Sequence, residues 1–523
     1  MNKKYAFVFI ISFLIGAKSF AQSDTKDPKA WTPEDIVYTE SMRAPVFSPD
    51  GNMVVWSKSK AVKKKDRFVA NLYLTRLGIQ EDGKFLTTQL TQGDENDYSP
   101  IFSKDSKALY FLSSRDKGKK LWKLSLYGGE AEEIHEFDNG ISSIQLKDKN
   151  TLFFTAKNGK TLYDLEAEEK EDNVQVIEDS LHWQPSHIYA FDLEDKKITR
   201  ITDNTKPIRS YQLSHDGNYL YYSITRSLSY GADAQKDPYS YLVNLKTGDK
   251  KQILKDFEFP IYSVQFSADD SGFYFGTGFS SDPEWNGAGI TELYYYDIAT
   301  AKATKVDLDW ELGIGGGYTV AGNDVIVSLA NKATMKLAYY TKKGTSWSRS
   351  EMDFEDKNEH VSLNAIADDA SKIVYTYSTA SKLPQYFVAD LKKNKVSNEK
   401  IFTALNKKLE KKYMPKSEII TWTGYNGDEV TGILYYPNNY QEGKKYPLML
   451  NIHGGPSSQD TDEWSGSWAY YPSILVQKNM FVLMPNYHGS SNHGLEYVEA
   501  IKGNYYEPEL EDITKGIDKL VAE

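Results

Sequence analysis

The chain has 523 residues, which suggests two or three domains, and 40% of them are hydrophobic, which is enough to form sizeable cores. Its formal net charge of −11 has the wrong sign for a protein that binds nucleic acid, and no basic stripe offsets it. The absence of cysteine excludes disulfides, thiolate metal sites and a cysteine nucleophile. Aromatic residues, mostly Tyr and Phe, make up 14% of the chain, so we expect a mostly β protein.

Residues 1–21 have the features of a signal peptide. Lys3 and Lys4 precede an apolar run of 13 residues, and Ser19-Phe20-Ala21 places small residues where signal peptidase cleaves. A membrane anchor is the alternative, but this run is too short to span about 30 Å of hydrocarbon. We therefore expect cleavage after Ala21, a mature protein that is periplasmic or secreted, and no membrane span.

A repeated pattern of strand, polar turn and strand runs through residues 22–401. Ser and Asp side chains bond to the backbone across such turns, and Gly supplies the positive φ that a hairpin requires. The turns are 43 to 68 residues apart, a spacing typical of four-stranded propeller blades. They centre on Asp50, Asp105, Asp148, Asp216, Asp269, Asn323 and Asp369. The repeat predicts a seven-bladed β-propeller, with eight blades as the alternative and a short helix leading into the first blade.

Three other interpretations of this region are less consistent with the sequence. Several unrelated β-sandwiches would not repeat one turn signature at blade-like intervals. The glycine-rich segment 313–317 lacks a following helix, so we expect a turn between blades rather than a nucleotide loop. Glu132, Glu133 and His135 lack the spacing of metal ligands. No metal site and no cofactor are predicted.

The pattern changes near residue 402. Apolar residues at helical spacing predict a charged linker helix over 402–417, ending before a proline. Residues 418–423 and 430–436 then read as a hairpin. The apolar runs 447–452 and 480–485 predict strands buried on both faces, and the apolar residues Leu510, Ile513, Ile517, Leu520 and Val521 predict a final helix. We assign residues 418–523 to the N-terminal part of an α/β-hydrolase domain.

The strand at 447–452 runs directly into the sequence His453-Gly454-Gly455-Pro456. Glycines allow the backbone to bend closely around a substrate and to direct an N–H group at a developing oxyanion. In α/β-hydrolases a loop in this position supplies one half of the oxyanion hole. A structural turn is the alternative, but the preceding strand and the later sequence Pro485-Asn486-Tyr487-His488-Gly489-Ser490 favour the catalytic interpretation.

Together, the export signal, the propeller, the Thr32-Pro33-Glu34-Asp35 helix start and these two motifs resemble the prolyl oligopeptidase family of serine peptidases. Within it the acylaminoacyl-peptidase and dipeptidyl-peptidase branches are most similar. The resemblance implies that the Gly455 amide donates to the oxyanion, that Gly454 shapes the loop, and that His453 and Pro456 position it. His488 stands where the family usually carries Arg, and it is a candidate substrate-binding residue.

The family's nucleophile lies on a G-x-S-x-G elbow, and the 523 residues contain no such sequence. The nucleophile, the Asp and the His of the triad are therefore expected to be absent from this chain, which we interpret as truncated before the catalytic serine and inactive as it stands. The full-length protein is predicted to be an exported serine-type oligopeptidase or exopeptidase, whose propeller limits access to short peptides. A peptide- or glycan-binding propeller with a vestigial hydrolase segment, and an esterase, are the alternatives. The sequence predicts no oligomeric state.

Overall fold

The computed structural model describes residues 27–523 apart from 116–117, 138–139, 173, 175–183, 227–237, 258, 283–286, 456 and 468. The predicted signal peptide therefore lies outside the described residues. The first element is α1 (Pro33–Val37). Thr32 caps it by accepting a hydrogen bond from the Asp35 amide, and the Asp35 carboxylate accepts one from the Thr32 amide in return. Thr32 thus begins the short helix that the sequence predicted.

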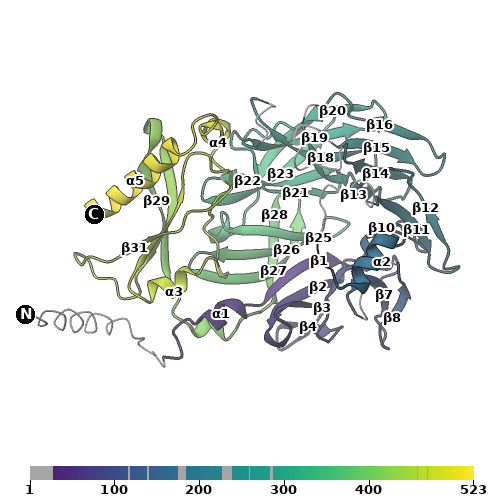
Figure 1. Ribbon diagram of the computed structural model, residues 1–523, viewed down its shortest axis with the longest axis horizontal. Coiled ribbons are helices and arrows are strands. Elements are labelled where there is room, and N and C mark those ends of the chain that lie inside the picture. The colour runs from purple at the N-terminus through teal and green to yellow at the C-terminus, as the bar shows by residue number, and fades with distance from the viewer. Residues whose placement is uncertain are drawn as a thin grey trace, which may run out of the picture.

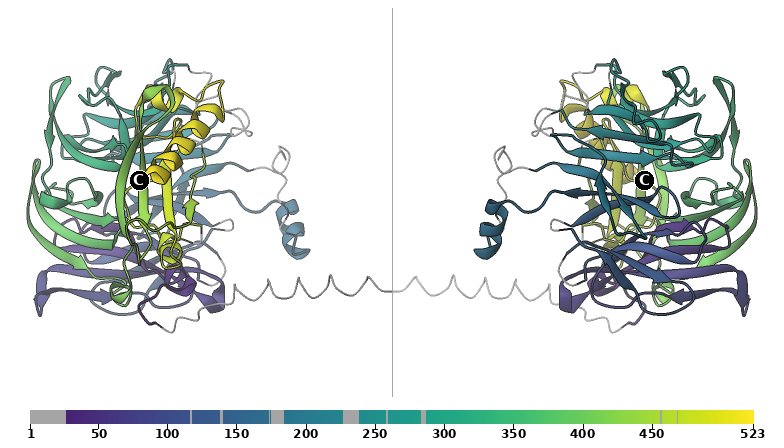
Figure 2. Two further views of the ribbon diagram at one scale, coloured as in Figure 1. Left: turned by 90° about the vertical axis from the view of Figure 1, so that its left-hand side faces the viewer. Right: turned by 90° about the vertical axis from the view of Figure 1, so that its right-hand side faces the viewer.

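Seven four-stranded antiparallel blades follow, and together they form the propeller in Figure 1. The first three blades are β1 (Ser41–Phe47), β2 (Met53–Val62), β3 (Arg67–Glu81) and β4 (Lys84–Gln89); β5 (Asp97–Phe102), β6 (Ala108–Ser113), β7 (Lys120–Ser125) and β8 (Glu132–His135); and β9 (Ile141–Leu146), β10 (Thr151–Lys157), β11 (Ser186–Asp192) and β12 (Ile198–Arg200). The helix α2 (Leu162–Glu169) lies between β10 and β11 and projects from the propeller in Figure 2.

The remaining four blades have the same strand order. They are β13 (Ile208–Leu213), β14 (Tyr219–Ile224), β15 (Tyr239–Asn244) and β16 (Lys250–Ile253); β17 (Ile261–Phe266), β18 (Gly272–Phe279), β19 (Ile290–Asp297) and β20 (Lys302–Lys305); β21 (Ile314–Ala321), β22 (Asp324–Asn331), β23 (Thr334–Lys343) and β24 (Ser346–Glu351); and β25 (Val361–Ile366), β26 (Lys372–Thr379), β27 (Lys382–Lys392) and β28 (Lys395–Thr403). One residue pair, Thr291 with Ile314, joins the fifth blade to the sixth. The described strands therefore form seven blades, not eight.

The repeated turns have one geometry in different blades. The Ser48, Ser214 and Ser267 hydroxyls donate to the carboxylates of Asp50, Asp216 and Asp269 over 2.5, 2.7 and 2.8 Å. Each carboxylate also accepts from the backbone amide two residues further on. The predicted equivalence of these turns is confirmed, and it follows from local side-chain chemistry.

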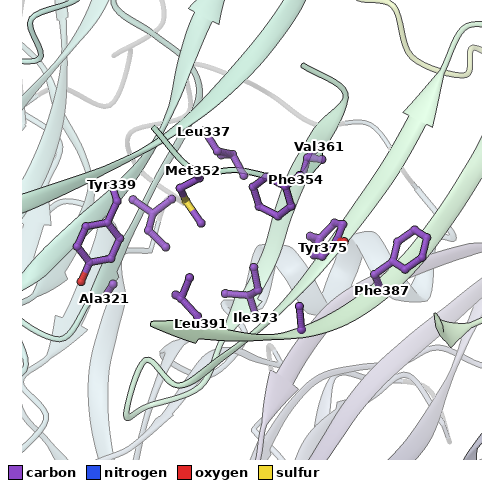
Figure 3. Packing of buried hydrophobic residues seen from close by; sticks show 12 residues of the cluster. Ala321, Leu337, Tyr339, Met352, Phe354, Val361, Ile373, Tyr375, Phe387 and Leu391 are labelled. Carbon is purple, nitrogen blue, oxygen red and sulfur yellow. The ribbon is translucent and has the colours of Figure 1, made fainter. Parts of the chain in front are cut away.

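Hydrophobic side chains fill the space between neighbouring blades. Figure 3 shows the cluster between the sixth and seventh blades, where Leu337 and Tyr339 pack with Ile373 and Tyr375. A similar cluster that includes Trp56, Val374 and Phe402 joins the first blade to the seventh. The ring of blades is therefore closed by side-chain packing.

Two expectations for the propeller and its connection require correction. Residues 314–317 are not a turn between blades, because they begin β21, where a bulge separates Ile314 from Gly317. The predicted helix over 402–417 is a single 3-10 turn, Leu409–Lys411. The apolar spacing arises because Phe402 and Leu405 pack between blades, whereas Leu409 packs with Trp31 in a different cluster.

The C-terminal region is a four-stranded sheet with helices, and it lies beside the propeller in Figure 1. Its strand order is β29 (Lys416–Thr423), β30 (Glu429–Tyr436), β32 (Phe481–Asn486) and β31 (Leu448–Leu450), and β31 runs parallel to β32. The helices are α3 (Pro472–Val476), α4 (Leu495–Glu499) and α5 (Glu507–Ala522). Single 3-10 turns occur at Lys63–Lys65, Glu355–Lys357 and Tyr425–Gly427.

Burial in this sheet differs from the sequence expectation. The strand β32 is buried as predicted, but β31 lies at the sheet edge and Met449 is 39% exposed. On α5, Ile513 is buried, while Leu510 is 60% and Val521 79% exposed. The spacing of apolar residues predicted the helix correctly, but it did not predict which of them are buried against the rest of the protein. In the part of the chain that the structure describes, no helix has the length and apolar character needed to cross a membrane.

Candidate oxyanion loop

The H-G-G-P segment leaves the sheet at the carboxyl end of β31. The Asn451 amide donates to the Leu483 carbonyl over 2.9 Å, which continues the pairing with β32 past the last residue of the strand. The next residue but one, His453, is 4% exposed, whereas Gly454 and Gly455 are exposed. The chain therefore passes from a buried anchor directly to two accessible glycines.

His453 holds the loop to the segment that follows β32. Its Nε2 lies 3.0 Å from the Ser490 hydroxyl, and its carbonyl accepts a hydrogen bond of 2.5 Å from the Tyr487 hydroxyl. The two rings stack with their centroids 4.6 Å apart. This arrangement agrees with the predicted positioning role for His453. The sequence did not identify Ser490 and Tyr487 as its partners, because they lie 37 and 34 residues away along the chain and only the folded sheet brings them together.

Gly455 has the backbone conformation that the loop requires. Its φ of 149° is one that residues with a side chain rarely adopt, and a Cβ atom there would lie 3.1 Å from the Ser457 amide nitrogen. Among the described residues no backbone carbonyl accepts a hydrogen bond from its amide. It can therefore act as a hydrogen-bond donor, as the predicted oxyanion role requires. Pro456 lies outside the described residues.

The loop continues from Ser458 to Trp464 along the propeller. The Asp462 amide donates to the Ala333 carbonyl over 2.7 Å, and its carboxylate accepts from the Ala380 amide over 2.8 Å. The Trp464 amide donates to the Ser378 hydroxyl over 3.0 Å. The segment after the glycines is thus fixed to the sixth and seventh blades.

His488 is not placed to contact a substrate in this structure. Its side chain is 1% exposed, and its two ring nitrogens lie 2.7 Å from Asp512 and 3.2 Å from Asp428. Burial alone would lower the pKa of His488, but the hydrogen bonds and charges of Asp512 and Asp428 outweigh it and raise that pKa. The side chain forms a buried ion pair, so the candidate substrate-binding assignment has no support from its geometry.

Burial lowers the pKa of His453 to about 4. Between pH 6.5 and pH 4 the unfolded chain therefore takes up a proton at this residue that the folded chain does not, and stability falls as the pH falls. We expect the free energy of unfolding to be lower by roughly 3 kcal/mol at pH 4 than at neutral pH because of His453 alone. Urea unfolding across this range should show a shallower pH dependence for His453→Gln. Equal slopes for His453→Gln and the unmodified chain would contradict the expectation.

The structure thus combines a propeller with an α/β sheet that carries an exposed glycine loop at a strand end, the position of an oxyanion loop in α/β-hydrolases. The sequence profile of the prolyl oligopeptidase family matches residues 466–523. An uncharacterized peptidase, YuxL, of Bacillus subtilis is 23% identical over 94% of this chain and 76% of its own length. Dipeptidyl-peptidase 5 of Porphyromonas gingivalis is 22% identical over 100% of this chain and 77% of its own length.

Solved structures give the same result for the fold. The acylaminoacyl peptidase of Pyrococcus horikoshii superposes with a TM-score of 0.71 at 15% identity, over 94% of this chain and 72% of that one. A puromycin hydrolase superposes with a TM-score of 0.65 at 13% identity, over 94% and 74%. The resemblance to the prolyl oligopeptidase family is therefore confirmed, and so is the predicted fold of a propeller followed by part of an α/β-hydrolase domain. Of the described residues, no group of three or more His, Asp or Glu side chains is placed to hold a metal ion.

Proposed function

We propose that the protein is an exported serine-type peptidase that acts on short peptides by acyl transfer. The observation that carries this proposal is the exposed Gly454-Gly455 pair at the end of β31, on a loop fixed to the propeller. Its backbone amide would stabilise the oxyanion formed when a nucleophile attacks the scissile carbonyl. The nucleophile is expected on a G-x-S-x-G elbow, a sequence that does not occur in the 523 residues.

The contacts between the two regions support a role for the propeller in limiting access. The Glu499 carboxylate accepts hydrogen bonds from Ser280 and Ser281 of the fifth blade. Lys332 of the sixth blade forms an ion pair with Glu429 over 2.6 Å, and its amide donates to the Asn492 carbonyl. These contacts hold the C-terminal region against the fifth and sixth blades, and Asp462 and Trp464 of the loop after the glycines contact the sixth and seventh. A propeller packed so closely against this loop would sterically limit access by a large folded protein.

The activity is tested on the product of the whole gene. We expect hydrolysis of peptide nitroanilides, with rates that fall steeply as the peptide is lengthened beyond a few residues. Peptide substrates should also be preferred over p-nitrophenyl esters. Hydrolysis of esters alone would identify an esterase, and rates independent of peptide length would contradict a limiting role for the propeller.

Export rests on residues 1–21. Their charged start, apolar run and small residues before the cleavage position support removal of the segment after Ala21. N-terminal sequencing of the protein from the cell envelope or medium should begin at Gln22, and an intact Met1 in the cytoplasm would contradict export.

A further inference from the structure

An asparagine at the end of β32 is bonded to the loop that follows the glycine pair. Asn486 is fully buried; its Oδ1 accepts a hydrogen bond of 2.7 Å from the Asp460 amide, and its Nδ2 donates to the Asp460 carbonyl over 2.8 Å. One side-chain amide therefore satisfies both backbone groups of a residue 26 positions earlier in the chain. A carboxylate in its place could accept but not donate, and an alkyl side chain could do neither.

Asn486 is itself held by the elements around it. Its backbone pairs with Thr431 of β30, and its carbonyl accepts a hydrogen bond of 2.7 Å from the hydroxyl of Tyr497 on α4. The Tyr497 carbonyl in turn accepts a hydrogen bond of 2.9 Å from the Gly489 amide. The side chain of Asn486 therefore extends from a fixed point of the sheet, and it can act as an anchor for the loop.

This anchor reaches the glycine pair through Ser458. The Ser458 carbonyl accepts a hydrogen bond of 2.9 Å from the Ser491 amide. A Cβ atom on Gly455 would lie 3.3 Å from the Ser458 amide nitrogen, so these two residues lie directly against each other. On the other side of the glycines, the segment 486–491 also holds His453. The loop is thus fixed both before and after Gly455 by one short segment.

A buried carboxyl group favours movement of the loop away from this position. The Oδ2 atom of Asp460 is buried, and among the described residues it has no hydrogen-bond partner. Burial raises the pKa of Asp460 to about 7. Because burying a carboxyl group without a partner costs free energy, conformations that bring it to solvent are favoured. The hydrogen bonds between Asn486 and the backbone of the same residue oppose that movement.

We propose that Asn486 is a positioning residue for the oxyanion loop, a role that rests on the proposed peptidase function. A backbone amide stabilises an oxyanion best when it lies about 2.7–3.1 Å from the developing charge and points at it. By fixing Asp460, Asn486 keeps Gly455 in the position from which its amide can do so. Because Asn486 is fully buried, it touches no substrate and acts only through the loop.

The product of the whole gene is used to separate positioning from folding. Asn486→Ala should lower kcat for a peptide nitroanilide about 10-fold or more and leave KM within about 2-fold, because the oxyanion forms only in the transition state. A peptide aldehyde, whose adduct with a serine nucleophile carries the same oxyanion, should bind more weakly in the same proportion. The peptide amide of the same sequence forms no such adduct and should bind as before. A purely structural asparagine would leave the ratio of the two affinities unchanged.

Two further variants serve as comparisons. Asn486→Ser keeps one hydroxyl that can bond to the loop, so it should give a smaller loss in the same direction, and it replaces the alanine variant if that protein does not fold. Asn439→Ala removes the same amide group from an exposed loop and should behave as the unmodified enzyme does. An unchanged kcat, or an unchanged ratio of aldehyde to amide affinity, in the Asn486 variants would overturn the proposal.

Hydrogen exchange on residues 22–523 tests the same anchor without catalysis. In Asn486→Ala the amides of residues 457–460 should exchange about 10-fold or more faster, because the Asp460 amide loses its acceptor and the loop opens more often. The amides of β30 should exchange at their original rate. Unaltered exchange of the loop would overturn the proposal, whereas faster exchange together with a whole-gene product that hydrolyses no peptide would contradict the proposed function instead.

Discussion

Replacing Asp512 with alanine is expected to destabilise the C-terminal region by about 3–5 kcal/mol, because it removes the nearer of the two carboxylates of buried His488 and leaves two amides without their acceptor. Asp512 is fully buried on α5, and its carboxylate accepts hydrogen bonds of 2.7 Å from the amides of Tyr425 and His488. It also lies 2.7 Å from the His488 ring. One carboxylate thus joins α5 to the end of β32 and to the turn before β30.

The pH dependence of this loss has a definite sign. The pKa of His488 is raised in the folded chain, so its ion pair contributes fully below the unfolded value of about 6.5 and is lost as the pH rises through the folded value. The effect of Asp512→Ala should therefore be larger at pH 6 than at pH 9. Urea unfolding at both values measures it.

Two variants serve as controls for this prediction. Asp512→Asn keeps an oxygen that can accept from the Tyr425 amide and should cost less than Asp512→Ala. Asp518→Ala, at an exposed position of the same helix, should change stability by less than about 0.5 kcal/mol. A loss no larger for Asp512→Ala than for Asp518→Ala would show that the ion pair contributes little.

The propeller could be predicted because its signal is local. A serine that donates to an aspartate two residues later determines its turn without help from the rest of the chain, so Ser48 and Ser214 mark equivalent hairpins. The prediction of a linker helix was wrong because its signal was not local. Phe402 and Leu409 are buried in separate clusters of the folded protein, and their helical spacing reflects no shared helix face.

The site was only partly predictable for a related reason. The glycine loop follows from the sequence because strand and motif are adjacent. The environment of His488 could not be predicted from the sequence, because its partners Asp428 and Asp512 lie 60 and 24 residues away along the chain. The hollow beside Glu463 likewise forms only where a loop of the C-terminal region meets the sixth and seventh blades of the propeller. Such constellations depend on tertiary packing, and only a structure reveals them.

Residues 22–523 are expected not to react with a fluorophosphonate probe and not to hydrolyse peptides at an enzymatic rate. A serine nucleophile needs an accessible hydroxyl and a base near the working pH. Among the described residues, the serine that pairs with an imidazole is Ser490, which is 0% exposed. The pKa of its partner, His453, is lowered to about 4, so this imidazole is a weak base at neutral pH.

The loop amide alone cannot replace that chemistry. An oxyanion donor stabilises an intermediate that a nucleophile must first create, and binding with an oxyanion hole leaves roughly 10³–10⁴-fold acceleration over water. Enzymes typically reach about 10⁶-fold or more. Probe labelling and peptide-nitroanilide turnover of residues 22–523 measure the difference, with a known serine hydrolase in the same reaction as the positive control. Because the predicted background does not depend on Ser490, Ser490→Ala should leave it unchanged. Stoichiometric labelling of any serine, with turnover that tracks it, would place the active site within this chain.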